Sequence, residues 1–373
     1  MTEASHGEAL RTLKEVFEHR ITQRLAQRQR LIQEGKPDAE GPLAFVLPVS
    51  VEEVQLLAEV AEKHSVPLVA LGAGTAPTPE IGAEEESTLS DMKKGSILIR
   101  FDLMRRTRLP ADPEEPWVEV EPGTLWLELD NDLRSRGRGL AVYPTSAPRA
   151  TVGGWLAIDG LGVGSFEYGW LRENVLSASV VLPGGERREV RGEDLRSFVE
   201  PGGSAGIVVG AKLRTRRADT DVPFAATFTD AESLAGAVTG VTRAGVPLWH
   251  LAFLNPEMAR VRGLGEDHLL FGAYPRERAQ NVEESLRDTL ESYRGRVLAA
   301  AEAYRVWTER FFPVAPSHPT PKVVRKFVSV AELPEALGDT SDRPEHAAVQ
   351  GTVARSEEVL LLTFDAREEG WRW

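Results

Sequence analysis

Two glycine-rich segments, far apart in the sequence, carry the residues best suited to bind a bulky ligand. The first is Gly72-Ala73-Gly74-Thr75, which ends the apolar run 66–71. The second is Thr151-Val152-Gly153-Gly154, followed by more glycines up to residue 169. Successive backbone N–H groups without obstructing side chains can hold a diphosphate. Glycine at this density is costly unless the backbone needs a positive φ or must touch a flat ligand. Together the loops predict one site for a phosphate-containing ligand with a flat ring.

Neither loop fits the two common phosphate-binding motifs. A Rossmann loop continues from Gly-x-Gly-x-x-Gly directly into a helix. Here Pro77 and Pro79 follow the first loop and the third glycine is absent. A P-loop would end in Gly-Lys and Ser or Thr, and this loop has no such ending. An isolated Gly-x-Gly is more often only a tight turn, so the prediction depends on both loops together.

Composition narrows the class of protein. The length of 373 residues predicts two domains. The net charge of −13 disfavours nucleic acid as a partner. The chain has no cysteine, which excludes thiol nucleophiles, disulfides, iron–sulfur ligation and cysteinyl cofactor attachment, so any redox chemistry needs a cofactor. We see no stretch resembling a transmembrane segment or a signal peptide, and we expect a cytoplasmic protein.

Hydrophobic periodicity predicts the elements that carry the loops. An amphipathic helix is expected over 8–34, and a second helix over 51–64, where Ser50 and Glu53 form a capping-box pattern. A helix is also predicted over 125–136, after the turn Pro122-Gly123, and a hairpin turn over 183–186. The strands expected in this half are 44–47, 66–71, 97–101, 117–121, 176–182, 187–190 and 207–215.

A charged segment near residue 217 predicts a domain boundary. Beyond it we expect strands over 224–228 and 247–254 and helices over 231–244 and 277–293. The predicted organisation is an N-terminal helical segment (1–40), a ligand-binding domain (41–217) and a second domain (218–373).

Five segments in order resemble the FAD-linked oxidases and dehydrogenases of the vanillyl-alcohol-oxidase, or p-cresol methylhydroxylase (PCMH), type. The branch that they resemble contains glycolate oxidase subunits and D-lactate and D-2-hydroxyglutarate dehydrogenases. The segments lie between residues 45 and 215: they are 48–75, 120–125, 144–154, 168–185 and 203–209. The resemblance implies an α+β protein with a two-subdomain PCMH-type FAD-binding domain and a smaller α+β cap domain with a mostly antiparallel sheet.

The resemblance also implies how FAD, bound non-covalently, contacts the chain. The first loop (Gly72, Ala73, Gly74 and Thr75) would bind the pyrophosphate, and Ile207 and Val208 would meet the adenosine through backbone groups. The segments along the ribityl chain and ring would supply Pro144, Thr145, Thr151, Val152, Gly153, Gly154, Ile158, Asp159, Ser165 and Tyr168. Asp159 departs from the family, which commonly has asparagine there. A carboxylate at this place should disfavour an anionic reduced flavin.

In the cap, Trp307-Thr308-Glu309-Arg310 resembles a Trp-x-x-Arg motif whose arginine binds a substrate carboxylate in 2-hydroxy-acid dehydrogenases. Arg325 stands where the family has a second basic group. A forked guanidinium suits a carboxylate. The alternative is a surface Arg310 beside a core tryptophan. His250 is a candidate base, although a histidine inside a strand is more often a packed residue.

The resemblance stops short at the C-terminal end. Relatives carry a histidine-rich metal motif and a closing segment after the cap; this sequence shows neither, so we expect no metal site and a short cap. The first hypothesis is an FAD-dependent oxidoreductase for a glycolate- or D-lactate-type 2-hydroxy acid, with a quinone, protein or oxygen as acceptor. The alternatives are a non-catalytic electron-relay subunit of a hetero-oligomeric oxidase complex and a reductase of the enolpyruvyl-glucosamine type.

Overall fold

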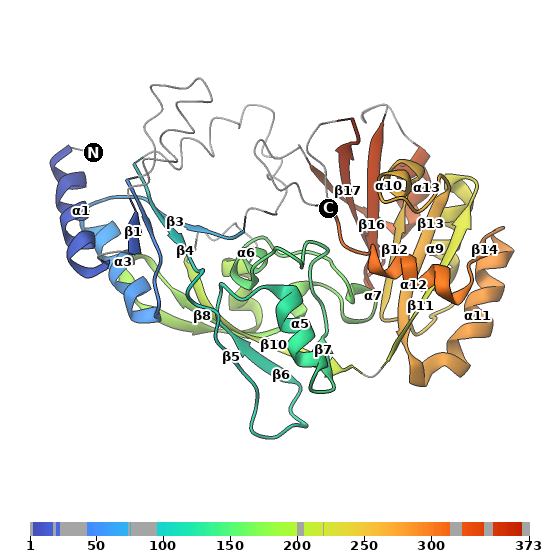
Figure 1. Ribbon diagram of the computed structural model, residues 1–373, viewed down its shortest axis with the longest axis horizontal. Coiled ribbons are helices and arrows are strands. Elements are labelled where there is room, and N and C mark those ends of the chain that lie inside the picture. The colour runs from blue at the N-terminus through green and yellow to red at the C-terminus, as the bar shows by residue number, and fades with distance from the viewer. Residues whose placement is uncertain are drawn as a thin grey trace.

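The computed structural model describes residues 3–17, 20–22, 43–73, 75, 95–199, 205–218, 220–313, 323–338 and 346–367. The described residues form three sheets, two in the half that carries the glycine loops and one in the C-terminal half (Figure 1).

The first sheet has the order β1-β2-β4-β3 and holds the first glycine loop. Its members are β1 (Ile21–Thr22), β2 (Ala44–Val46), β3 (Leu68–Leu71) and β4 (Ile97–Arg100). Strands β2, β4 and β3 are parallel, and the crossover between β2 and β3 is α3 (Val51–Lys63). Ser50 caps α3 by accepting a hydrogen bond from the Glu53 N–H, as predicted. The loop after β3 therefore leaves the carboxyl end of a parallel strand, where ligands commonly bind.

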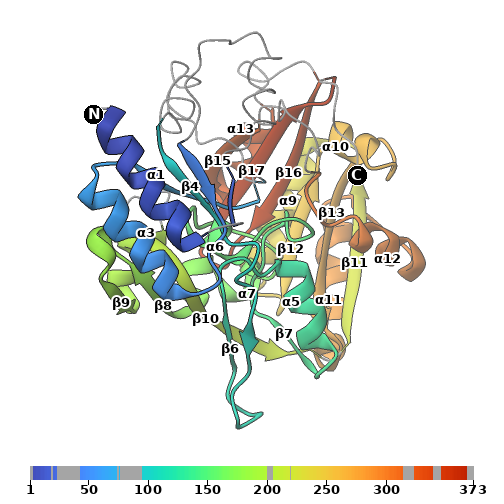
Figure 2. The same cartoon turned by 60° about the vertical axis from the view of Figure 1, so that its left-hand side comes forward.

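The N-terminal helix is shorter than predicted. Helix α1 (Glu3–Phe17) ends before Arg20, and β1 then pairs antiparallel with β2, with Ile21 opposite Val46. The predicted helix over 8–34 was therefore wrong at residues 21–22, which form a strand. Apolar residues at helical spacing can also form a short strand at the edge of a sheet. Residues 23–34 lie outside the described ranges. Helices α1 and α3 lie side by side on this sheet (Figure 2).

The second sheet is antiparallel and is organised around the long strand β10 (Ile207–Arg217). Its order is β5-β6-β10-β8-β9, and β7 pairs with the end of β10. The other strands are β5 (Thr107–Arg108), β6 (Trp117–Val120), β7 (Arg138–Leu140), β8 (Val175–Val181) and β9 (Arg187–Val190). The hairpin turn is confirmed as η3 (Pro183–Gly185). The helices here are α5 (Trp126–Arg134), α6 (Val152–Leu156), α7 (Ser165–Tyr168), η2 (Leu171–Asn174), η4 (Gly192–Leu195) and α8 (Arg196–Val199).

The third sheet is antiparallel throughout, with the order β14-β11-β13-β12-β16-β17-β15. The strands are β11 (Asp221–Phe228), β12 (His250–Leu254), β13 (His268–Pro275), β14 (Arg296–Val297), β15 (Val324–Ser329), β16 (Ala347–Val353) and β17 (Glu358–Asp365). One core lies between the sheet and α9 (Ala231–Arg243), α11 (Ala279–Ser292) and α13 (Leu333–Gly338), and the other between it and α10 (Pro256–Val261) and α12 (Ala300–Thr308). Short η5 (Arg276–Arg278) and η6 (Val330–Glu332) precede α11 and α13.

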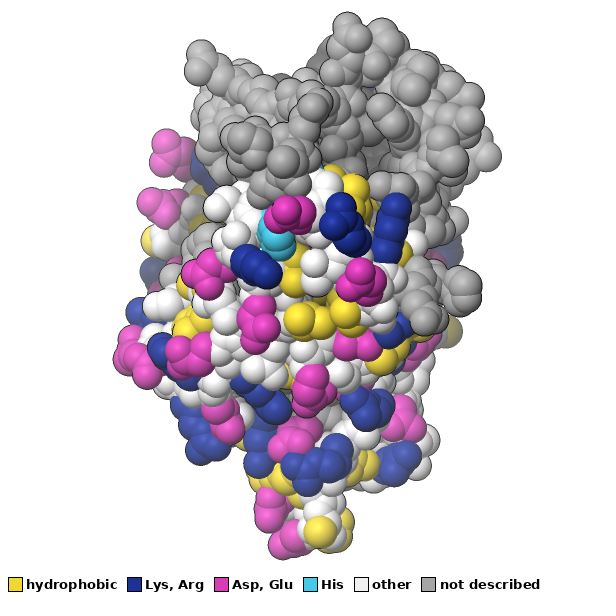
Figure 3. Space-filling model, turned by 90° about the vertical axis from the view of Figure 1, so that its left-hand side faces the viewer, with side chains coloured by type: hydrophobic (Ala, Val, Ile, Leu, Met, Phe, Trp, Pro, Cys, Tyr) yellow, Lys and Arg dark blue, Asp and Glu magenta, His cyan; other side chains and the backbone are white. Residues whose placement is uncertain are grey.

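These sheets confirm the predicted α+β class with a mostly antiparallel C-terminal sheet. The domain limits at 40 and 217 stay predictions. Acidic and basic side chains are interspersed on the end of the molecule seen in Figure 3, with no continuous basic patch on the visible described surface. Within the described ranges, no helix is long and apolar enough to cross a bilayer.

Candidate FAD site

The two glycine loops, predicted as halves of one site, lie in contact. A methyl group added to Gly72 would stand 2.8 Å from the Cα of Gly154 and 3.3 Å from the Thr151 hydroxyl oxygen. Thr151 caps α6 by accepting a hydrogen bond from the Gly154 N–H at 3.3 Å. Glycine at 72 and 154 therefore lets the loop after β3 meet the first turn of α6.

The first loop offers backbone donors to a ligand. Gly72 and Ala73 are exposed, and the N–H groups of Gly72, Ala73 and Thr75 donate to no acceptor among the described residues. Gly74 lies outside those residues. The second loop differs: the N–H groups of Val152 and Gly153 donate to the carbonyls of Thr124 and Pro122, both at 2.8 Å. The first loop can thus hold a diphosphate as a nest of N–H groups, whereas the second supplies mainly its shape.

The other predicted FAD residues fall into two groups by burial. Those with a partly exposed surface are Thr151, Gly153, Gly154, Ile158, Tyr168 and Ile207. Those that are buried are Pro144, Thr145, Val152, Asp159, Ser165 and Val208. The Ser165 hydroxyl accepts from the Gly162 N–H at 2.9 Å, so its side chain is already committed within the protein. Strand β6 pairs with β10 only over Ala211–Arg214, which leaves Ile207 and Val208 without a strand on that side within the described residues.

Asp159 is held by an arginine of its own domain. It adopts a left-handed backbone (φ 49°), and its Oδ1 accepts from the Arg172 N–H at 3.1 Å while Oδ2 pairs with the Arg172 guanidinium. Burial raises the pKa of Asp159, and the pairing with Arg172 opposes this rise. Because Arg172 offsets the carboxylate charge, the expected effect on a reduced flavin is weakened; it stays a prediction.

Arg310, just beyond the end of α12, reaches the segment 143–145, which precedes the second loop. Its Nε donates to the Tyr143 hydroxyl at 3.1 Å and its Nη1 to the Trp307 carbonyl at 3.0 Å. The Phe312 N–H donates to the Thr145 carbonyl at 2.8 Å, which fixes the segment 310–312 against 143–145. The guanidinium is half-buried, and no carboxylate of the described residues lies within ion-pair distance of it. The contact with Trp307 also agrees with the alternative of a packing role.

Arg325, in β15, reaches the segment around Asp159 in the half that carries the glycine loops. Its Nη2 donates to the Asp159 carbonyl at 3.1 Å and lies 3.1 Å from where a side chain on Gly160 would begin. Burial lowers the pKa of Arg325. A β-bridge between Tyr143 and Val163 joins the two segments that the arginines contact. The cap thus places two cations on the segments predicted to bind the flavin.

His250 is packed in the interior. It has no exposed surface, and its Nδ1 accepts from the Gly164 N–H at 3.4 Å. Burial, with a smaller contribution from Arg310, lowers the pKa of His250 to about 3. The ring packs against Trp307 and Phe271, with centroids 5.8 and 6.1 Å away. This geometry favours the packing alternative, and the role as a base stays a prediction. The described residues hold no cluster of three or more His, Asp or Glu suited to a metal ion.

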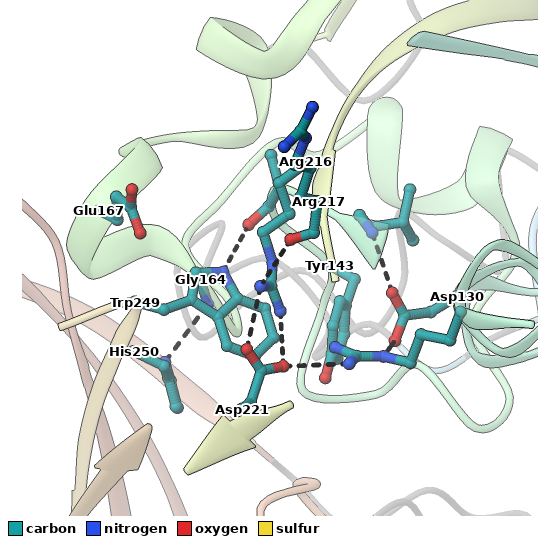
Figure 4. A network of polar contacts seen from close by, with 12 residues as sticks. Asp130, Tyr143, Gly164, Glu167, Arg216, Arg217, Asp221, Trp249 and His250 are labelled. Atoms are coloured by element: carbon teal, nitrogen blue, oxygen red, sulfur yellow. Dashed lines mark hydrogen bonds and ion pairs between the residues drawn. The ribbon is translucent and has the colours of Figure 1, made fainter. Parts of the chain in front are cut away.

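A buried ionic network that the sequence did not reveal joins the loop-bearing half to the third sheet (Figure 4). Arg216 binds Asp221 through two hydrogen bonds of 3.0 and 2.7 Å, and Arg134 bridges Asp221 (3.0 Å) and Asp130 (2.7 Å). The Arg216 guanidinium lies 3.7 Å from the centre of the Trp249 ring. The charged segment near residue 217 does not reveal this network in the sequence, because charge alone does not show burial.

Comparison with known proteins agrees with this geometry. Residues 42–191 match the family model described as FAD binding domain. The mitochondrial D-lactate dehydrogenase [cytochrome] of Arabidopsis thaliana is 29% identical over 265 residues, which are 65% of this chain and 45% of that protein. The glycolate oxidase subunit GlcD of Bacillus subtilis is 26% identical over 230 residues, 57% of this chain and 46% of that protein. The chain thus spans about half the length of these relatives.

Two solved structures share the fold over nearly the whole chain. An alkyldihydroxyacetonephosphate synthase superposes with a TM-score of 0.75 at 20% identity, covering 97% of this chain and 81% of the other. A p-cresol methylhydroxylase with bound substrate gives 0.74 at 14% identity, covering 99% and 84%. Such identities establish the fold alone. The contact between the glycine loops fits FAD, the cofactor that the family model names, as do the N–H groups of Gly72, Ala73 and Thr75, which donate to no acceptor among the described residues. Residues 42–191 of this chain are therefore an FAD-binding domain, and the chain is similar in sequence to D-lactate dehydrogenases and a glycolate oxidase subunit and in fold to p-cresol methylhydroxylase.

Proposed function

We propose that the protein is an FAD-dependent oxidoreductase that oxidises a 2-hydroxy acid of the glycolate or D-lactate type and passes the electrons to a quinone, protein or oxygen acceptor. The observation that carries this proposal is Arg310. It is a half-buried cation, held by Tyr143 against the predicted flavin segment and without a carboxylate partner among the described residues. A partly desolvated guanidinium in that position suits an anionic substrate.

Each residue of the site would have a defined task. The N–H groups of Gly72, Ala73 and Thr75, which have no acceptor among the described residues, would hold the diphosphate of FAD. FAD would itself be the acceptor of the substrate's hydride. Arg310 would bind the substrate carboxylate through Nη2, which donates to no described residue, while Tyr143 and the Trp307 carbonyl hold Nε and Nη1. Arg325, held at the Asp159 carbonyl, would add a second positive charge.

Anaerobic mixing with single hydroxy acids tests the proposal. We expect one of glycolate, D-lactate or D-2-hydroxyglutarate to bleach the flavin absorbance. The rate of bleaching should be close to the turnover rate of the same acid with a dye as electron acceptor. Acid denaturation and filtration should release all the colour, because cysteine is absent and we expect a non-covalent cofactor. Failure of every acid tested to bleach the flavin would contradict the proposal.

The second candidate is an FAD-binding subunit that relays electrons within a hetero-oligomeric complex and does no substrate chemistry. His250, the candidate base, has no exposed surface, which favours this alternative. A flavin that resists all the hydroxy acids but accepts electrons from a reduced dye would support it.

A further inference from the structure

Two buried side chains hold the backbone on which Arg310 stands. Arg310 follows the end of α12, where the last carbonyls have no intrahelical N–H partner. The Arg262 Nη1 donates to the Glu309 carbonyl, and the Gln350 Nε2 donates to the Arg310 carbonyl at 3.1 Å. Residues distant in the sequence, from the end of α10 and from β16, thus converge on two successive carbonyls.

The two side chains also bind each other, which leaves Gln350 one orientation. The Arg262 Nη2 donates to the Gln350 Oε1. A guanidinium can only donate and a carbonyl can only accept, so the amide oxygen must face Arg262 and the amide nitrogen must face Arg310. Arg262 is 7% exposed and Gln350 is fully buried. Each of these two side chains makes two of the hydrogen bonds described, which restricts its rotation.

The backbone of Arg310 is consequently fixed on both sides. Its N–H donates to the Trp307 carbonyl at 3.3 Å, its carbonyl accepts from Gln350, and the N–H of Phe312 is bound to Thr145. We propose that Gln350, oriented by Arg262, is a positioning residue that sets the place of the Arg310 guanidinium for a substrate carboxylate. This inference rests on the proposed function of Arg310.

Two substitutions of Gln350 separate positioning from packing. Gln350→Glu keeps an acceptor for Arg262 but cannot donate to the Arg310 carbonyl when ionised. Gln350→Met keeps the size and adds no charge. Asn255→Asp is the matched control: Asn255 caps α10 and donates to the Ala347 carbonyl of β16, but has no contact with Arg310.

The experiment titrates oxalate, a planar dicarboxylate, into the FAD-loaded protein by calorimetry, and records the melting temperature of each variant. We expect both Gln350 variants to bind oxalate more weakly by about tenfold, since displacement of a binding group by a fraction of an ångström is costly. Asn255→Asp should stay within about twofold of the wild type. In an Arg310→Ala background, Gln350→Met should cause no further loss, because positioning acts only through Arg310.

The outcomes separate this inference from the function it rests on. If Gln350→Met binds oxalate as tightly as the wild type, the positioning role is overturned. It is also overturned if Gln350→Met weakens oxalate binding equally in the wild-type and Arg310→Ala backgrounds. Either result leaves the proposed carboxylate site intact. A loss confined to Gln350→Glu would trace the effect to the added charge and overturn it as well. Should Gln350→Met fail to fold, Gln350→Glu is compared with and without Arg310 by the same criterion. Oxalate affinity unchanged by Arg310→Ala would instead contradict the proposed function itself.

Discussion

Arg310 contacts both Tyr143, in the half that carries the glycine loops, and Trp307, in the helix that precedes it, so its substitution distinguishes substrate binding from packing. If it binds a substrate carboxylate, Arg310→Ala should cost about 2–5 kcal/mol in transition-state binding, as loss of one partner of a desolvated charge pair does. Arg310→Lys should recover only part, because an ammonium cannot make a forked contact. The measurement is kcat/KM with the hydroxy acid that bleaches the flavin.

Flavin content and melting temperature serve as the control for this change. Both should barely move in Arg310→Ala. Turnover that is indifferent to both substitutions would remove Arg310 from the site, and a variant that unfolds would assign it to bracing Trp307.

His250 predicts how stability depends on pH. Its folded pKa of about 3 lies below the ordinary value of 6.5, so the unfolded chain takes up a proton first as the pH falls. Stability should therefore be lost from about pH 6.5 downward, by about 2 kcal/mol at pH 5. Asn can still accept from the Gly164 N–H and does not titrate. Urea denaturation of His250→Asn between pH 7 and 5 should accordingly show a flatter pH dependence than the wild type. An identical slope would show that His250 does not titrate as its burial requires.

At the scale of elements, the contact between the loop after β3 and the first turn of α6 predicts the effect of substituting Gly72. A methyl group there would stand 2.8 Å from Gly154 Cα, so Gly72→Ala should force the loops apart and lower the FAD content of the purified protein. Gly7→Ala is the control, because nothing lies within 4 Å of a methyl group on this exposed glycine of α1. The ratio of flavin to protein absorbance measures retention. Equal ratios for both variants would show that the contact between the loops is not needed for FAD.

Elements with a local signal could be predicted from the sequence, and those defined by distant partners could not. Ser50 and Glu53 marked the start of α3, and Pro183 with two glycines marked the hairpin, because caps and turns depend on adjacent residues. Strands β16 and β17 were not predicted, since they are buried on both faces and show no alternation. For the site, the sequence indicated both loops and Arg310, but not Gln350, whose hydrogen bonds to Arg262 and to the Arg310 carbonyl join segments that are distant in the chain.

At the scale of the whole molecule, the cap reaches the FAD-binding half through three kinds of contact. Arg310 and Arg325 reach the predicted flavin segments, Trp170 stacks on Phe327 with ring centroids 5.0 Å apart, and Arg278 pairs with Glu167 at 2.8 Å. The buried network around Asp221 lies at the crossing from β10 to β11 (Figure 4). Geometry at Arg310 therefore depends on how the two halves are held together.

Asp221 should contribute more to that attachment than a surface ion pair does. The Arg216 and Asp221 side chains are 5% and 7% exposed, and Asp221 also binds Arg134. Asp221→Asn removes the negative charge that both guanidinium groups share. Because it leaves Arg216 buried beside a neutral amide, we expect a loss of about 3–5 kcal/mol in the free energy of unfolding, measured by urea denaturation. The exposed pair Arg188–Glu186 is the control, and Glu186→Gln should change stability by at most about 1 kcal/mol. Equal effects of the two substitutions would mean that other contacts hold the cap in place.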